Sequence, residues 1–333
     1  MARSSMKAIL VTGGSGFIGL AVGEALLDRG IKVVGFDLAP PPQSALRRFE
    51  ELPGEFVHVR GNVQDDKEIA AAISENGVDA IIAMAAITAD LDRERRDARS
   101  VIEVNVGGTI ATLEAARATG VKRIAYIGSG SAYGAAGYDT ELLDEEETPT
   151  IPESLYGISK LAAEQTALRL GDVFGLDVRV GRLGTCFGPW EYATGARDTP
   201  SAVFQIVRNF RSGKPVSLPR PHPKDWLYSR DAAQAIIALL GAEKADHRIY
   251  NLGAGFVWSL VDLCELLQKE NPGFDWEVSD KAADAINLYS SRDRAAMACT
   301  RIQSLDYRPE YGLEAALPDY LEWCESSEVA LTA

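Results

Sequence analysis

The eight residues "TGGSGFIG", from Thr12 to Gly19, constrain the fold of this chain more than any other stretch. They follow the apolar run "KAILV" and open a helix-length pattern that ends at Gly30. Gly13, Gly16 and Gly19 allow a tight turn, a close approach of a pyrophosphate to the backbone, and close packing of a helix on a strand. The helix N-terminus offers free N–H groups and its positive dipole end to phosphates. This stretch therefore predicts a dinucleotide-binding strand–turn–helix unit.

Asp37 ends the second β-branched run, "KVVGFD", about 18 residues after Gly19. An acidic side chain at this place accepts hydrogen bonds from the 2′-hydroxyl of a ribose. It also repels a 2′-phosphate, and the following Leu38 and Ala39 supply no cation to hold one. The expected cofactor is therefore NAD rather than NADP.

The first half of the chain alternates short β-branched runs with helix-length patterns. Such alternation predicts a parallel sheet covered by helices on both faces. The fold class is therefore α/β, with a doubly wound parallel (Rossmann) sheet. One long helical stretch is expected from about Arg93 to Thr119. The predicted strands are "KAILVTG", "KVVGFDL", "EFVHVRG", "DAIIAMAA", "RIAYIGS" and "DVRVGRL".

This rhythm breaks after about Gly184, where loops rich in proline and glycine, "GPWEYATGARDTP" and "LPRPHPKDW", separate the helices. We predict an NAD-binding Rossmann domain over residues 1–184 and a smaller, mainly helical, substrate-binding part over residues 185–333. Within the latter, a segment at about 224–254 is expected to return to the Rossmann domain. Residues 1–5 are expected to be a disordered lead-in.

The composition of the chain limits the kinds of molecule that it is expected to bind. The formal net charge is −14, from 48 acidic and 34 basic residues, and such a surface repels nucleic acid and anionic lipid. A glycine cluster and Glu24 interrupt the N-terminal apolar run, which favours a strand, turn and helix over a membrane segment. Dispersed histidines and cysteines argue against a metal site, and the cysteines favour a reducing cytoplasm. The cysteines are Cys186, Cys264, Cys299 and Cys324.

Tyr156 and Lys160 lie four residues apart in "SLYGISK", on one face of a predicted helix. The preceding strand ends at Ser129, and ligands of parallel sheets bind beyond the carboxyl ends of the strands. A phenol has a pKa of about 10, which a nearby ammonium lowers. Tyr156 is therefore the expected base that takes a proton from a substrate alcohol as hydride leaves. Ser129 is expected to bind the reacting oxygen, and Lys160 the nicotinamide ribose.

Several motifs of the chain occur in a recognisable order. The chain resembles the extended short-chain dehydrogenases/reductases, the NAD-dependent epimerase/dehydratase family, over nearly its whole length. The resemblance implies a Ser/Tyr/Lys mechanism. It also implies homodimers joined by a four-helix bundle, which the two long helices could supply. The motifs are "TGGSGFIG", "NVGGT" at 105–109, "GSGSAYG", "YGISK", "FGP" at 187–189 and "KDWLYSRDAA" at 224–233.

The resemblance further implies adenine contacts near Asn62 and Val63, backbone contacts near Ala85, and a supporting role for Asn105. No metal ligand is expected. The residues predicted to contact NAD are Gly13, Ser15, Gly16, Phe17, Ile18, Gly19, Asp37, Asn62, Val63, Ala85, Asn105, Tyr156, Lys160 and Leu183. The residues predicted to contact a small carbohydrate substrate are Thr88, Ser131, Thr185, Lys224 and Arg292.

Some residues of this chain differ from those typical of the family, and these differences indicate which type of reaction to expect. Dehydratases of the family resemble one another in having an Asp-Glu pair just after the equivalent of Ser129, and decarboxylases usually have a Glu in place of Ser131. Here those positions hold Gly130 and Ser131, so both reactions are disfavoured. Nucleotide-sugar enzymes typically have Asn in place of Thr185 and Arg in place of Lys224, and Lys keeps the charge but not the bidentate geometry.

Three hypotheses for the function remain open. The first is a nucleotide-sugar epimerase that retains its NAD. The second is an NAD-dependent dehydrogenase of a free sugar-derived polyol, acid or lactone. The third is a non-catalytic NAD-binding regulator. In the first hypothesis Arg292 and Arg294 could provide a second phosphate contact.

Overall fold

The computed structural model describes residues 6–280, 284–288 and 290–326, so the predicted lead-in at residues 1–5 lies outside the described residues. A seven-stranded parallel sheet forms its centre, with strand order β11-β7-β5-β4-β1-β2-β3. The doubly wound Rossmann fold is therefore confirmed. The strands are β1 (Ala8–Thr12), β2 (Lys32–Asp37), β3 (Phe56–Arg60), β4 (Ala80–Ala83), β5 (Arg123–Ser129), β7 (Asp177–Leu183) and β11 (Ile249–Leu252).

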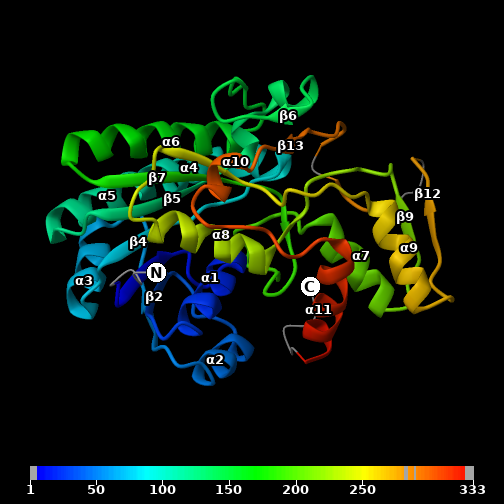
Figure 1. The fold of residues 1–333 in the computed structure, drawn as a ribbon, viewed down its shortest axis with the longest axis horizontal. Coiled ribbons are helices and arrows are strands. Elements are labelled where there is room, and N and C mark those ends of the chain that lie inside the picture. The colour runs from blue at the N-terminus through cyan, green and yellow to red at the C-terminus, as the bar shows by residue number, and fades with distance from the viewer. Residues whose placement is uncertain (1–5, 281–283, 289, 327–333) are drawn as a thin grey trace.

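Both faces of the sheet are buried because successive side chains point to opposite sides. In β1, Ile9 and Val11 belong to one hydrophobic cluster, and Leu10 belongs to another. Helices α1 and α8 cover the first face, where they lie side by side (Figure 1). Helices α3, α5 and α6 cover the second face. Their bounds are α1 (Phe17–Leu27), α3 (Asp66–Asn76), α5 (Gly108–Thr119), α6 (Leu155–Phe174) and α8 (Ser229–Gly241), and a short helix α2 (Gln43–Glu50) packs on α1.

The long helix expected before Thr119 is interrupted in the structure. It consists of α4 (Leu91–Ile102), a π turn at Glu103–Gly107, and α5. Single π turns within α-helices are frequent at functional sites. Here the turn holds Asn105, whose buried side chain donates a hydrogen bond to the hydroxyl of Ser159 in α6.

The C-terminal part is smaller and mainly helical, and it lies at one end of the molecule (Figure 1). Its helices surround a third hydrophobic cluster. Helix α8 and strand β11 instead join the central sheet, so the chain crosses back between the two parts. The remaining elements are β6 (Leu142–Leu143), β8 (Cys186–Phe187), α7 (Ala202–Arg211), β9 (Val216–Leu218), β10 (Leu227–Tyr228), α9 (Leu260–Glu270), β12 (Trp276–Val278), β13 (Ala296–Met297), α10 (Thr300–Gln303) and α11 (Leu313–Ser326).

All four cysteines are free, buried thiols. Across residues 6–280, 284–288 and 290–326, no helix combines the length and apolar character needed to cross a bilayer. The same residues contain no group of three or more histidine, cysteine, aspartate or glutamate side chains placed to hold a metal ion.

Candidate active site

A cavity of about 1150 Å³ opens at the carboxyl ends of the strands. The strand order reverses between β1 and β4, and ligands of open α/β sheets bind at such a switch point. The cavity runs from Asp37 at the end of β2, past Ser129 at the end of β5, to Lys224 in the C-terminal part. It is therefore long enough to be shared by a dinucleotide and a second ligand.

The glycine loop at one end of this cavity has no room for side chains. Gly13 has φ +73°, and a Cβ there would lie 2.9 Å from the Cα of Ala85. A Cβ on Gly19 would lie 2.2 Å from the carbonyl oxygen of Gly13. Gly16 caps α1 without a side-chain hydrogen bond, so the first N–H groups of the helix face the cavity unobstructed by a cap. This cradle fits the pyrophosphate of NAD.

Asp37 occupies the adenosine end of the cavity. Its carboxylate accepts hydrogen bonds from the backbone N–H groups of Ser15 (3.1 Å) and Ala39 (3.4 Å). The Ser15 hydroxyl donates to the carbonyl oxygen of Ala39 (2.8 Å), which ties the glycine loop to the end of β2. Asn62 and Val63 line the cavity beside Asp37. These contacts fix a carboxylate where a ribose hydroxyl is expected.

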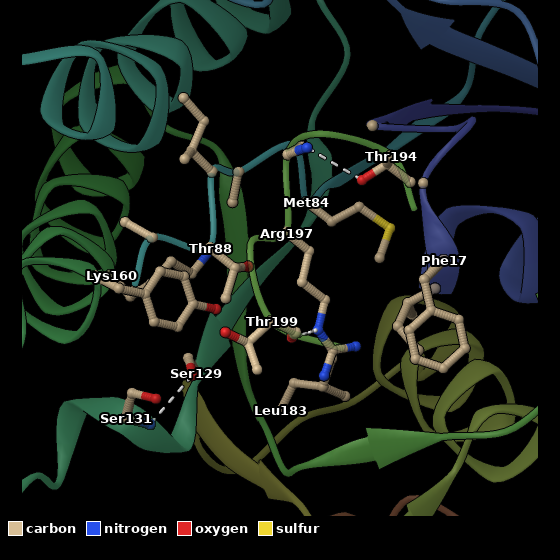
Figure 2. A pocket seen from close by; sticks show the side chains of 18 of the residues that line it. Phe17, Met84, Thr88, Ser129, Ser131, Lys160, Leu183, Thr194, Arg197 and Thr199 are labelled. Atoms are coloured by element: carbon tan, nitrogen blue, oxygen red, sulfur yellow. Dashed lines mark hydrogen bonds between the residues drawn. The ribbon is translucent and has the colours of Figure 1, made fainter. Parts of the chain in front are cut away.

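Ser129 and Tyr156 meet at the centre of the cavity. Ser129 ends β5, and its hydroxyl accepts a hydrogen bond from the backbone N–H of Ser131 (3.1 Å; Figure 2). Helix α6 begins at Leu155 because the hydroxyl of Ser154 caps the N–H of Gly157 (3.1 Å), which places Tyr156 in the first turn.

The environment of the Tyr156 phenol has opposing effects on its pKa. Burial raises the pKa, whereas hydrogen bonds with the hydroxyls of Ser129 and Thr88 lower it. The positive charge of Arg197 also lowers it. Burial is the largest of these effects, so the pKa of Tyr156 lies above its ordinary value, contrary to the expectation that its neighbours would lower it.

Lys160 differs from the expectation that it would lower the pKa of Tyr156. Its ammonium donates to the carbonyl oxygen of Ile127 (2.6 Å) and lies 4.8 Å from the centre of the Tyr126 ring. Burial lowers the pKa of Lys160 to about 7, opposed by the charge of Glu164. The side chain lines the cavity one turn after Tyr156, so it remains placed to contact a cofactor.

Asn105 is the one predicted contact residue that does not line the cavity. It is fully buried, and its amide exchanges hydrogen bonds with the backbone of Ile87 (2.7 and 3.0 Å) and donates to the hydroxyl of Ser159 (2.9 Å). It therefore joins the loop after β4 to helix α6, which carries Tyr156 and Lys160.

The sequence reasoning missed the segment 188–201, which crosses the cavity. On one side the hydroxyl of Tyr192 donates to the carbonyl oxygen of Ser15 (2.5 Å). On the other side the N–H of Thr88 donates to the carbonyl oxygen of Ala196 (2.8 Å), and Asp198 pairs with Arg93 (2.6 Å). The segment is thus attached to both walls of the cavity.

Arg197 projects from this segment into the cavity, between Phe17 and Thr199 (Figure 2). Its guanidinium lies 5.7 Å from the centre of the Phe17 ring, donates to the carbonyl oxygen of Thr199 (3.1 Å), and pairs with the buried Glu191 (3.1 Å). The only sequence feature that marks Arg197 is its place in a loop directly after a predicted strand.

The predicted substrate residues all line the cavity. Thr88 and Ser131 lie near Ser129 and Tyr156, whereas Lys224 and Arg292 lie in the C-terminal part. Arg292 pairs with Asp139 (3.1 Å) at the exposed rim. The backbone carbonyl oxygen of Thr185 accepts a hydrogen bond from the N–H of Leu227 (2.9 Å).

The comparison with known families agrees with this geometry. The family model described as "NAD dependent epimerase/dehydratase family" matches residues 9–253. The chain belongs to the NAD-dependent epimerase/dehydratase family. Its cofactor is accordingly NAD.

Relatives in this family include both epimerases and dehydratases. The chain is 25% identical to a dTDP-glucose 4,6-dehydratase of Xanthomonas campestris, over 96% of this chain and 93% of that protein. It is 27% identical to UDP-glucuronate 4-epimerase 1 of Arabidopsis thaliana, over 96% and 77%. A solved dTDP-glucose 4,6-dehydratase of Bacillus anthracis, in complex with NAD, superposes with a TM-score of 0.79 at 24% identity, covering 97% of each chain.

These relatives correct one prediction. The residues Gly130 and Ser131 predict that the protein is not a dehydratase, but dTDP-glucose 4,6-dehydratases are among the similar relatives, so this prediction is wrong. The two residues that follow Ser129 are not enough to exclude a dehydratase, because other carboxyl groups line the same cavity. These are Asp90, Asp92, Glu94 and Glu153.

Substitution of Asp37 tests whether this end of the cavity binds NAD. Asp37→Ala is expected to weaken NAD binding by about 10- to 100-fold, because a hydrogen bond to a charged group contributes about 1.5–3 kcal/mol. The discrimination against NADP should shrink as well, since the repulsion of a 2′-phosphate is lost. Titration calorimetry with both cofactors measures this. Asp28→Ala, at the exposed end of α1, is the matched control. Equal affinity of the unaltered protein for NADP would contradict the role of Asp37.

Proposed function

We propose that this protein catalyses NAD-dependent hydride transfer at a secondary alcohol of a nucleotide-linked sugar, and that it acts as an epimerase. The main support is the arrangement at Tyr156, whose side chain lines the same cavity as those of Ser129 and Thr88, at the carboxyl end of the sheet. Lys160 follows one helical turn later, on the same face.

In the proposed reaction the Tyr156 phenolate takes the proton from the substrate hydroxyl, and Ser129 donates a hydrogen bond to the same oxygen. Lys160 would hold the ribose of NAD, and the bound cofactor would supply the redox chemistry by taking up hydride from the carbon that bears this oxygen and returning the same hydride to the opposite face of that carbon. Tyr156 returns the proton to the oxygen, which completes the epimerisation. Ser129 and Thr88 keep the phenol in place throughout.

Two observations support a nucleotide-linked substrate. The cavity continues past the catalytic centre to the cations Lys224 and Arg292, which suit a diphosphate. The relatives named above act on sugars linked to UDP or dTDP. Because several of these relatives are dehydratases, loss of water from the same class of substrate is the second candidate function.

The proposal is tested by incubating the purified protein with UDP-glucose, UDP-galactose, UDP-glucuronate and dTDP-glucose. Parallel reactions contain free sugar acids and added NAD. Products are separated by anion-exchange chromatography and weighed by mass spectrometry, and absorbance at about 340 nm reports NADH. The expected result is a stereoisomer of one nucleotide sugar, with unchanged mass and no accumulation of NADH.

The other outcomes separate the alternatives. A product lighter by one water supports the dehydratase function. Steady release of NADH with free sugar acids alone overturns the nucleotide-sugar proposal in favour of a dehydrogenase. NAD binding without conversion of any substrate overturns a catalytic role and supports a regulator.

We further propose a cytoplasmic homodimer in which residues 185–333 bind the substrate. The four free cysteines support a reducing compartment. Helices α4 and α6 pack together and expose apolar side chains that a second copy could cover. These side chains are Leu91, Ile102, Ile158 and Val173.

A further inference from the structure

Arg294 lies beside the catalytic centre, although it is far from Ser129 in the sequence. Its guanidinium donates to the carbonyl oxygen of Gly130, the residue next to Ser129, and its side chain lines the cavity. A Cβ on Gly130 would lie 3.1 Å from Nη2 of Arg294. A Cβ on Gly137 would lie 2.3 Å from its Cγ. Two glycines thus make room for this arginine at the sugar end of the cavity.

The charge of Arg294 is not neutralised by an ion pair within the described parts of the chain. Its Nε is buried without a hydrogen-bond partner among the described residues. Burial lowers the pKa of Arg294, with the charge of Asp225 opposing this effect. The Asp225 carboxylate itself accepts a hydrogen bond from the backbone N–H of Met297 (3.0 Å). A buried cation is costly unless an anion compensates it.

The acidic residue adjacent to Arg294 is already engaged elsewhere. Asp293 accepts a hydrogen bond from Arg220 (2.9 Å) and contacts His222. Lys224 adds a second cation: burial and then repulsion by Arg294 lower its pKa to about 8. Arg294 and Lys224 are thus two neighbouring cations, and an anion in the cavity would stabilise both.

The position of Arg294 separates it from Arg292, the arginine with which the sequence analysis grouped it as a phosphate contact. Arg292 lies at the exposed rim with Asp139 and over the Tyr138 ring (4.3 Å). Arg294 instead donates to the carbonyl oxygen of Gly130, directly after Ser129. A group that pairs with Arg294 therefore lies on the side of the cavity where Ser129 and Tyr156 are expected to bind the sugar.

We propose that Arg294 is a specificity-determining residue that binds a carboxylate on the sugar, so that the substrate is an acidic sugar of the uronate class. This inference rests on the proposed function, whose site it deepens. The planar guanidinium binds a carboxylate with two parallel hydrogen bonds, which a neutral hydroxymethyl group cannot reproduce. The carboxylate can belong to a nucleotide-linked or to a free sugar acid.

Binding is measured by calorimetry in NAD-loaded protein that carries Tyr156→Phe, which prevents turnover. The ligands are UDP-glucuronate, UDP-glucose, UDP and free glucuronate. Arg294→Met is expected to weaken the affinity for UDP-glucuronate by about 10- to 100-fold, because a charge-assisted hydrogen bond is lost. The affinities for UDP-glucose and UDP should change by less than about twofold. Arg294→Lys keeps the charge and should give an intermediate loss. Arg248→Met, which removes an exposed arginine paired with Asp172, is the matched control.

The ligands separate the possible outcomes. If free glucuronate binds in an Arg294-dependent manner and UDP-glucuronate does not, the carboxylate site is supported. The natural ligand is then a free sugar acid rather than a nucleotide-linked one. Equal losses for UDP and UDP-glucuronate in Arg294→Met overturn the proposal, because Arg294 then contacts the diphosphate. Equal affinity of the unaltered site for UDP-glucose and UDP-glucuronate overturns it too.

The same measurements keep the two proposals apart. Arg294-dependent binding of UDP-glucuronate, without conversion of it by the protein that retains Tyr156, refutes the proposed reaction and leaves the carboxylate site standing. Conversion of neutral nucleotide sugars only, with no loss in Arg294→Met, refutes the carboxylate site and supports the reaction. Unchanged affinity for NAD shows that each variant is folded. If Arg294→Met fails this check, Arg294→Lys is decisive: no selective loss for the acidic ligands overturns the proposal.

Discussion

Tyr156→Phe is expected to lower kcat for the proposed reaction by about a thousandfold, within the 10²–10⁴-fold range typical of a positioned acid–base group. The substitution removes only the phenol hydroxyl of Tyr156, which lines the same cavity as Ser129 and Thr88. The ring keeps its place in the first turn of α6, so the affinity for NAD should change little. Initial rates with the best nucleotide sugar and a fluorescence titration with NAD measure both effects.

Tyr133→Phe is the matched control for this variant. Tyr133 lies in the same region of sequence as Ser129, but its hydroxyl is fully buried and donates to Oδ1 of Asn251 (2.7 Å). It does not line the cavity. Loss of this hydroxyl should lower the free energy of unfolding and leave kcat within about twofold of that of the unaltered protein. The catalytic assignment fails if Tyr156→Phe retains full turnover, or if Tyr133→Phe is equally inactive while folded.

Glu164→Ala is expected to destabilise the protein by about 3–5 kcal/mol, the usual cost of removing one partner of a buried ion pair. Glu164 accepts two hydrogen bonds from Arg182 (2.9 and 2.7 Å), and the side chains are 0% and 4% exposed. Nη1 of Arg182 already has no hydrogen-bond partner among the described residues. Loss of the carboxylate would therefore leave an uncompensated charge between α6 and β7. Urea denaturation followed by circular dichroism measures the change.

Two further variants show whether the charge is responsible. Glu164→Leu combined with Arg182→Met should recover most of the stability, because apolar side chains can replace a buried pair at little cost. Asp172→Ala breaks the exposed pair of α6 with Arg248 and should cost at most about 1 kcal/mol. A loss below about 1 kcal/mol in Glu164→Ala would contradict the importance of the buried pair.

Much of the central fold could be predicted from periodicity. All six predicted strands are present, and Gly30 and Gly120 follow α1 and α5 as expected. Strand β11, with the sequence "IYNL", was not predicted, because four residues give too little pattern to distinguish a strand from a loop. Helix α2 was missed for a similar reason, since only Ala45 and Phe49 of its eight residues are buried.

The sequence by itself determined the Rossmann fold, the NAD cradle and the candidate roles of Ser129, Tyr156 and Lys160. These features depend on local spacing, which a single stretch of chain contains: glycines every three residues, or two side chains one helical turn apart. Each could therefore be recognised before its neighbours in space were known.

Only the tertiary structure decided which distant side chains meet these groups. It placed Arg197 and Arg294 beside the catalytic centre, and it directed the ammonium of Lys160 to the carbonyl oxygen of Ile127. Arg197 was not predicted as a site residue, and Arg294 was considered only as a phosphate contact, because both lie in loops whose sequence has no periodicity to indicate where their side chains point. Their partners lie many residues away along the chain, and such contacts arise only when the packed sheet and helices bring the loops together.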